Sequence, residues 1–541
     1  MTDQIIETKK CAISWQAFTI TQWDLDFYDK ISPTFAGQKF TIPTPTLCPE
    51  ERQRRRLAFR NERHLYRRTC DASGKQIISI YSPDKPYKVY DQKIRRSDSR
   101  DAMEYGRDFD FSKTFTENMK ELIIKVPRVW IINDNWVGSL NCDYTNDFVW
   151  GKNCYMCFEM GDCEDCLFSH HSNGSKSCTD CDECTWCQFC YEVTDSLNCY
   201  NCKYSQWMNN CIWCFYSAFL ISCTDCVFCC GLTNQKYCYM NKQYSKEDYE
   251  KKVEQIFNDV DFKNEQINLF ANVILRKHAN NLIISSENCT GYNIMSSNNL
   301  KNCHNCFYSN DVSYWLSLYQ VKNSMDIQCR KTELCLEWQT LDESYGSWFC
   351  SRSSRSKFIW YCDNCHDSQN LFWCIGLRNK SYCIFNKQYT KEEYETLVAK
   401  IIMHMQSTGE WWEFFHPSLS PFGYNETVAQ EYYPLQKIED ERWTKEDNRL
   451  SSISYLSSFW YHRSDYESPK PVPDKVIQGK DLPEAIDEVQ DDILHYAIAC
   501  EATGKLFRIQ PQELVFYRKH HIPLPRKHPD QRHLERLALR K

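Results

Sequence analysis

The sequence contains little glycine and no long apolar run. Only 15 of the 541 residues are glycine. No segment matches a phosphate loop, an HExxH zinc helix or a GxSxG nucleophile turn, so the sequence indicates no particular enzyme class. The opening residues, MTDQIIETKKC, lack the apolar stretch of a signal peptide, and no later stretch has the length of a membrane span. We therefore expect a cytoplasmic protein without a membrane partner, and we lean toward a non-enzymatic function.

Cysteine, in contrast, is abundant, with 33 residues. Nineteen lie between Cys142 and Cys238 and ten between Cys289 and Cys383, and the remaining four are Cys11, Cys48, Cys70 and Cys500. Cytoplasmic thiols are mostly reduced, which favours metal ligands or packed thiols over a secreted disulfide framework. Cysteine is also a small, easily buried side chain, so packing alone is a sufficient explanation.

The first cluster follows a strict period of twelve. Nine cysteines lie in one unbroken series: Cys142, Cys154, Cys166, Cys178, Cys190, Cys202, Cys214, Cys226 and Cys238. Other columns of the same period hold cysteine, serine and aliphatic residues, so that every third residue is small or apolar. A short fixed period is typical of a stacked solenoid, and we expect these third residues to fill a slim interior. A larger coil made of two twelves is the main alternative.

The second cluster is a looser copy of the first. Every third residue from Ser347 to Leu377 is small or apolar, whereas the stretch from Cys289 to Cys329 drifts out of register. Both clusters end alike, in CCGLTNQKYCYMNKQYSKEDYE and CIGLRNKSYCIFNKQYTKEEYE, at a constant offset of 145. Capping boxes at Ser245 with Asp248, and at Thr390 with Glu393, predict a helix after each cluster that covers its open edge.

The two ends of the chain also repeat each other. Cys11, Phe18 and Lys30 match Cys500, Phe507 and Lys519, and after a nine-residue shift Arg52 and Arg56 match Arg532 and Arg536. The shared pattern is FY-x-K…P-x-x-x-P-x-x-R-x-x-x-R-L-A-x-R. One basic module therefore opens and closes the sequence.

Two known groups of proteins share features with this chain. Its period and inward residues resemble the twelve-residue solenoids of insect antifreeze proteins, but the Thr-x-Thr ladder is absent and we do not expect ice binding. The end module, the two NKQY-[ST]-KE-[ED]-YE motifs and the DYESPKP segment resemble an uncharacterised cysteine-rich family of candidate-phyla (Patescibacteria-type) bacteria. That resemblance covers nearly the whole chain and implies terminal modules like zinc ribbons. It supplies no activity.

Zinc is therefore a possible cofactor, although each C-x-x-C pair has lost one cysteine. Ser14, Glu51, Ser73 and Thr503 stand where second cysteines are expected. Structural zinc takes four ligands, so Cys11, Cys48 and Cys70 need Glu51 or another group as the fourth. Thiol pairs in the solenoid are further candidate ligands for zinc or another soft metal: Cys163, Cys166, Cys187, Cys190, Cys199, Cys202, Cys211, Cys214, Cys223 and Cys226.

Charge is divided between the ends and the solenoid. The segment 51–68 holds eight arginines against two glutamates, whereas 142–238 holds four lysines against twelve acidic residues. Arginines interleaved with aromatic residues suit RNA or DNA, and a solvated helix face or internal pairing with the acidic solenoid are the alternatives. The candidate nucleic-acid-binding residues are Arg52, Arg54, Arg55, Arg56, Arg60, Arg63, Arg67, Arg68, Arg532, Arg536 and Arg540.

The resulting prediction is a mainly β protein: a two-block β-solenoid with twelve-residue periodicity, capping helices and small α+β terminal modules like zinc ribbons. Its predicted parts are a basic module (1–135), block 1 (136–243), a capping helix and spacer (244–284), block 2 (285–388), a capping helix (389–407), an aromatic and proline-rich segment (408–499) and a truncated second basic module (500–541). We expect the aromatic segment to cover the solenoid and to contain one helix near 483–498. The leading function is a binding or scaffold protein. Metal binding by the cysteine ladders is the second hypothesis, and a thiol redox enzyme using a cysteine with a base such as His170, His171, His304 or His366 is the third.

Overall fold

The protein is mainly β and divides into two compact units. The computed structural model describes residues 4–95, 97, 101–133, 138–171, 174–182, 205–258, 260–270, 283–435, 461–469 and 473–538. Unit 1 combines Met1–Trp130 with Asn281–Tyr466, and unit 2 combines Ile131–Asn280 with Glu467–Lys541. Each unit therefore contains one solenoid block and one end module, and the N-terminal module belongs with block 2. Within the described ranges, no helix has the length and apolar character needed to cross a bilayer.

Unit 1 holds the longer run of paired strands. Its helices are α1 (Gln22–Ile31), α2 (Pro49–Leu57), α3 (Gln92–Arg95), α4 (Phe115–Lys125), α8 (Lys391–Thr408) and α9 (Val428–Tyr432). The end module and its extension contain β1 (Ile5–Lys10), β2 (Ala17–Thr21), β3 (Thr34–Phe35), β4 (Gln38–Lys39), β5 (Tyr66–Thr69), β6 (Gln76–Ser79), β7 (Val89–Tyr90) and β8 (Arg128–Val129). Block 2 contains β17 (Ile283–Ile284), β18 (Gly291–Met295), β19 (Asn298–Phe307), β20 (Asn310–Tyr319), β21 (Lys322–Arg330), β22 (Leu336–Asp342), β23 (Lys357–Trp360), β24 (Gln369–Phe372), β25 (Ser381–Ile384) and β26 (Lys387–Gln388).

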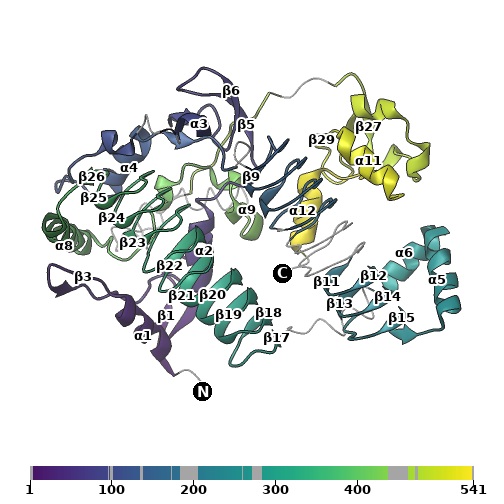
Figure 1. The fold of residues 1–541 in the computed structure, drawn as a ribbon, viewed down its shortest axis with the longest axis horizontal. Helices are drawn as coiled ribbons and strands as arrows, with labels where there is room; N and C mark the ends of the chain where they lie inside the picture. Colours follow the sequence, from purple (N-terminus) through teal and green to yellow (C-terminus); the bar gives the residue numbers. More distant parts are fainter. Residues whose placement is uncertain are drawn as a thin grey trace. The chain divides into compact units, whose positions relative to one another are not determined.

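Unit 2 is built on the same plan with shorter strands. Block 1 contains β9 (Asn146–Val149), β10 (Phe158–Gly161), β11 (Gln206–Asn209), β12 (Ile212–Phe215), β13 (Ala218–Ile221), β14 (Thr224–Val227), β15 (Lys236–Tyr239) and β16 (Lys242–Gln243), followed by α5 (Lys246–Asn258) and α6 (Val260–Leu269). The C-terminal module contains β27 (Val476–Gln478), β28 (Ala497–Ala499), β29 (Leu506–Phe507), α11 (Pro511–Lys519) and α12 (Pro529–Ala538). In Figure 1 the strands of each block form successive parallel rungs.

Most described turns of the solenoid contain twelve residues. Strand pairing joins Asn146 to Phe158 and Lys357 to Gln369, and most of the isolated bridges between the strands keep the same spacing. This register rules out the alternative of a larger coil made of two twelves. The drift in block 2 arises from eleven-residue turns, which place Ile283 beside Ile294 and Met325 beside Leu336.

A left-handed residue precedes almost every inward side chain. Asn141, Asn153 and Asp165 have φ of 56°, 55° and 55°, and the cysteine that follows each of them is buried. A left-handed residue at every third position turns the chain four times per coil, which produces the slim interior. Among residues other than glycine, asparagine and aspartate tolerate this conformation best. Their side chains also link the coils, since the Asn141 amide donates to Asn153 Oδ1 and the Asn153 amide to Asp165 Oδ1, both at 2.9 Å.

Block 2 carries an aromatic column on its outside. Phe349, Tyr361, Trp373 and Phe385 stack one coil apart, with ring centroids separated by 4.8, 5.3 and 5.6 Å. The segment after α8 covers this column, with Trp412 edge-on to Phe349 and with Phe415 near Trp373. Residues 411–415 of the aromatic segment thus pack on the solenoid as expected, whereas residues 482–493 of the predicted segment contribute to the core of the C-terminal module.

The NKQY motifs close the open end of each block. After the last parallel strand the chain reverses into β16 or β26. Asn386 then continues the ladder, because its side-chain amide donates to the Ile375 carbonyl at 2.9 Å and its Oδ1 accepts from the Ile375 N–H at 2.8 Å. Asn241 does the same with Cys230 in block 1. The predicted helices follow as α5 and α8. Thr390 and Glu393 make both bonds of a capping box, and at the start of α5 the Asp248 N–H donates to Ser245 Oγ at 3.2 Å.

The prediction of a helix near 483–498 is wrong. This segment forms short 3₁₀ turns at Ile486–Glu488 and Asp491–His495, followed by β28. Ile486, Val489 and Ile493 are still buried in the core of the C-terminal module. The apolar spacing therefore predicted the buried residues correctly, but it did not predict their secondary structure.

Candidate functional site

The solenoid thiols serve as internal hydrogen-bond donors. Sγ of Cys157 lies 3.5 Å from the Tyr155 carbonyl and 3.2 Å from the Cys166 carbonyl on the next coil. Ser217 makes the same pair of bonds with its hydroxyl, at 2.8 Å to Phe215 and 3.4 Å to Cys226. Cysteine and serine are therefore interchangeable in these columns because both are small and both donate to a buried carbonyl.

Thiols stacked along a column also contact one another. Hydrogen bonds from Cys142, Cys157 and Cys166 lower the pKa of Cys154, and the same contact with Cys154 raises the pKa of Cys166. Within the ranges that the structure describes, however, no three cysteines bring their Sγ atoms within 4.8 Å of one another. Cys163, Cys166, Cys211, Cys214, Cys223 and Cys226 thus form ladders and not a closed cage. Cys187, Cys190, Cys199 and Cys202 lie outside the described residues.

The end modules contain the same tight turn three times. In each turn the cysteine N–H is accepted by the carbonyl five residues later, and its own carbonyl accepts the N–H four residues later. These turns begin at Cys11, Cys70 and Cys500, and the fifth residue of each is left-handed: Trp15 at φ 62°, Gly74 at 70° and Gly504 at 69°. Burial raises the pKa of Cys70, but the Ser73 hydroxyl and backbone N–H groups outweigh this effect and hold that pKa below its usual value.

The first turn brings two of the predicted zinc ligands together. Cys11 and Cys48 are both buried and in contact, and Ser14 Oγ lies 3.6 Å from Cys48 Sγ. The hydrogen bond with Cys48 lowers the pKa of Cys11 to about 5 and raises the pKa of Cys48. Cys70 lies in a separate turn, where its Sγ accepts from the Asp91 N–H at 3.3 Å.

These residues do not fit a structural zinc ion. Zinc takes four sulfur or nitrogen ligands in such sites, whereas this turn offers two thiols, a hydroxyl and the carboxylate of Glu51. Among the described groups that approach within 4.8 Å of one another, no set of three includes Cys11, Cys48 or Cys70. The expectation that Cys11, Cys48 and Cys70 share one ion is therefore not met in this structure.

The N-terminal arginine cluster is buried against block 2. Arg52 Nε donates to Asp326 at 2.8 Å, and Arg56 donates to the other oxygen of the same carboxylate at 3.2 Å. Arg55 lies between Glu337 and Glu413, at 3.0 and 2.6 Å. The three guanidinium groups are at most 4% exposed. Helix α2 thus contacts the solenoid through paired buried charges, which are costly to break.

The C-terminal module repeats this contact on block 1. Arg536 Nε donates to Asp182 Oδ2 at 2.6 Å, and its Nη1 reaches Asp180 at 3.3 Å. Arg532 pairs with Asp180 as well. Burial raises the pKa of the neighbouring Glu513 to about 7, although Arg532 opposes this shift. The repeat of Arg52 and Arg56 in α12 therefore has a structural meaning, since both helices use the same two positions to contact a solenoid.

The remaining arginines of the predicted nucleic-acid surface are mostly engaged within the protein. Arg60 pairs with Glu62, Arg54 with Glu51, and Arg63 with Glu431, while Arg68 donates to the Ser82 and Tyr87 carbonyls. Arg67 is exposed, and Arg540 lies outside the described residues. A phosphate backbone would have to displace internal carboxylates to reach most of these side chains. The structure therefore favours internal pairing, one of the two alternatives, over an arginine surface open to solvent.

Sequence reasoning missed the carboxylates that receive the arginines. These carboxylates are buried and contact the arginines of α2 or α12; they are Asp180, Asp182, Asp326 and Glu337. The acidic excess of block 1 was the available signal, but it did not single out these side chains.

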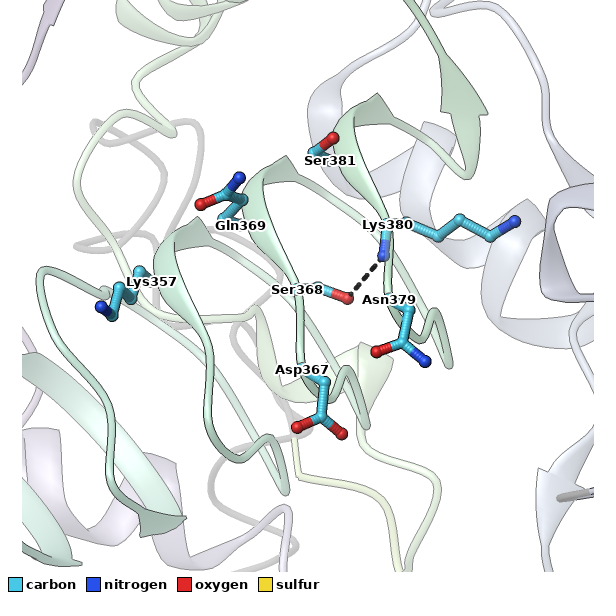
Figure 2. Close-up of a pocket in the computed structure, with 7 residues that line it drawn as sticks. All are labelled: Lys357, Asp367, Ser368, Gln369, Asn379, Lys380 and Ser381. Atoms are coloured by element: carbon cyan, nitrogen blue, oxygen red, sulfur yellow. Dashed lines mark hydrogen bonds between the residues drawn. The ribbon is translucent and has the colours of Figure 1, made fainter.

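An exposed polar groove crosses the last coils of block 2. Figure 2 shows Lys357, Gln369 and Ser381 on successive rungs, with Asp367 and Asn379 on the other side. The groove has a volume of about 310 Å³. Successive rungs lie about 4.8 Å apart, so polar groups repeat at this spacing along the groove.

Comparison of the chain with protein-family models, with curated proteins and with solved structures finds no match.

Proposed function

We propose that the protein is a non-enzymatic binding scaffold. In this proposal the thiols fill and hydrogen-bond the interior of each block, and the blocks are rigid surfaces on which other segments dock. The interchange of cysteine and serine in the inward columns supports the first part, because the hydroxyl of serine provides the same hydrogen bonds without a soft metal ligand.

One observation carries the proposal. The solenoid surface receives an Arg-x-x-x-Arg helix in each of the two units, through Asp326 in one and through Asp180 and Asp182 in the other. Docking of a separate element is thus the recurring use of this surface within the chain. The polar groove at Lys357, Gln369 and Ser381 is the exposed ladder surface on which we expect an external partner to lie.

Thiol reactivity and metal content of the full-length protein test this proposal together. The protein is purified under reducing conditions without chelator, metal is measured by mass spectrometry, and thiols are counted before and after unfolding. We expect at most one metal per chain and slow reaction of the solenoid thiols in the native state. Cys289 is only partly buried and should react before them, and Cys289→Ser is the matched control that removes this early phase.

Two other results would overturn the scaffold proposal. Several soft metal ions per chain, with an equal loss of reactive thiols, would make the ladders a metal-binding device. A single native cysteine of low pKa that reacts much faster than Cys289 would indicate thiol redox chemistry instead.

Nucleic acid is the partner class predicted from the arginine clusters, and it is tested separately. Phosphate contacts produce affinity that falls steeply with salt. The scaffold proposal expects no such binding by the native protein, because most of the described arginines in these clusters face internal carboxylates or carbonyls. Tight binding of RNA that weakens with salt, and that Arg67→Ala reduces, would contradict this expectation and show that the exposed arginine of the cluster contacts a phosphate backbone.

A further inference from the structure

We propose that His170, Asp182 and His533 form a binding site for one divalent transition-metal ion, of the kind typified by Zn²⁺. All three side chains belong to unit 2, and one ligand atom from each lies within 4.8 Å of the others. They are only 4%, 1% and 2% exposed. Two imidazole nitrogens and one carboxylate oxygen are a common donor set for zinc, and they leave a fourth position for water or a ligand.

The twelve-residue coil places the first two groups. His170 and Asp182 are bridged residues on neighbouring rungs, so their side chains leave the solenoid side by side. Their column faces α12, whose buried face includes Arg532, His533 and Arg536. His533 Nδ1 lies 3.4 Å from Asp182 Oδ1, and the His170 and His533 rings have centroids 5.3 Å apart.

The docking arginines orient the carboxylate. Arg536 holds Asp182 by Oδ2 at 2.6 Å, while Oδ1 is the oxygen nearest His533. Arg532 forms an ion pair with the neighbouring Asp180. Groups that hold the ligands in this way typically raise metal affinity because they fix the ligand geometry. On the solenoid side, the His171 ring lies edge-on to the His170 ring with centroids 4.1 Å apart, and His171 pairs with Glu159.

Comparison of the two end modules shows that His533 is not part of the docking contact that they share. The N-terminal copy docks with Arg52 and Arg56 but has Gln53 at the position of His533. Gln53 contacts the Tyr433 hydroxyl instead, at 2.6 Å. An imidazole at this position is therefore not needed for docking, and its presence in the C-terminal copy alone points to a ligand.

Cobalt substitution tests the proposal, because Co²⁺ reports the identity of its ligands. The full-length protein is stripped with chelator, kept reduced and titrated with Co²⁺. We expect one ion per chain with the weak visible bands of nitrogen and oxygen ligands, and without the intense near-ultraviolet band of sulfur-to-cobalt charge transfer. X-ray absorption of the wild-type protein with one Zn²⁺ should show only nitrogen and oxygen neighbours, at about 2.0–2.2 Å.

The variant His533→Gln introduces the residue of the N-terminal copy and should fold for that reason. We expect it to bind this ion at least tenfold more weakly, while His495→Gln, at an exposed position in the same unit, leaves binding unchanged. Circular dichroism and the unfolding midpoint of the variant check the fold. Equal Co²⁺ binding by wild type and His533→Gln, sulfur ligands alone in the wild-type spectra, or no bound ion would each overturn the proposal.

Discussion

Arg536 and Asp182 lie 354 residues apart in the sequence, yet Nε of the arginine donates to Oδ2 of the aspartate at 2.6 Å. Both groups are almost fully buried. The N-terminal module makes the equivalent contact with block 2 through Arg56, the counterpart of Arg536, and Asp326. The two units are thus interleaved along the chain, and the repeated arginines hold each module on the solenoid block of its own unit.

Removing Arg532 should destabilise the C-terminal module strongly. The substitution Arg532→Leu leaves Asp180 without one of its two buried arginines, and breaking such a pair typically costs about 3–5 kcal/mol. Limited proteolysis should then cut within 473–538 under conditions that leave the wild type intact. Arg518→Leu is the control, since Arg518 pairs with Asp491 at the surface and such pairs contribute roughly 1 kcal/mol or less. Equal protection of the Arg532 variant would contradict the docking role.

Serine should replace an inward cysteine with little effect. Cys214 donates to the Ile212 carbonyl at 3.4 Å, and the serine hydroxyl in the variant Cys214→Ser can make the same bond. We expect a loss of about 1 kcal/mol or less in the free energy of unfolding, whereas Cys214→Leu should lose about 1–3 kcal/mol because the coil has no room for it. Urea unfolding of the two variants distinguishes packing from metal ligation. A large loss in the serine variant, together with stabilisation of the wild type but not of the variant by added zinc, would favour ligation.

Asn386 of the second NKQY motif, which closes the ladder of block 2, should contribute strongly to the free energy of unfolding. Asn386 is buried, has φ of 62°, and makes three hydrogen bonds to the backbone of Ile375 and Ala102. Asn386→Ala should therefore lose about 3 kcal/mol or more, combining the lost bonds with left-handed strain. Asn386→Gly also removes the three hydrogen bonds, but glycine adopts the left-handed conformation without strain. This variant should therefore be less destabilised than Asn386→Ala. If glycine restores full stability in thermal unfolding, the hydrogen bonds do not contribute.

The stability of unit 2 should depend on pH through Glu513. Burial raises its folded pKa to about 7, above the unfolded value near 4.5. The stabilisation that follows from this raised pKa is complete below pH 4.5 and is lost as pH rises to about 7, for a total of up to ~3 kcal/mol. Denaturant unfolding at pH 5 and pH 8 should therefore show a smaller decline for Glu513→Gln than for the wild type. Parallel declines would show that Glu513 titrates normally.

The periodic part of the molecule could be predicted from the sequence because it depends on local repetition. The column from Cys142 to Cys238 fixed the length of each coil, and the capping boxes located the helices after both blocks. The covering contacts could not be predicted in this way. Whether Asp326 or His170 is buried depends on which distant helix lies over an outward column. The candidate metal ligand His533 is a single substitution within the repeated module, where the N-terminal copy has Gln53.

The most direct test of the interleaved docking is a double-mutant cycle on Arg52 and Asp326. We expect Arg52→Met and Asp326→Asn each to lower the free energy of unfolding by about 3 kcal/mol or more, because each leaves a buried partner charge behind. The double variant should lose much less than the sum of the two, with a coupling of at least ~1 kcal/mol. Strictly additive losses, or single losses below about 0.5 kcal/mol, would contradict the claim that this pair holds the N-terminal module on block 2.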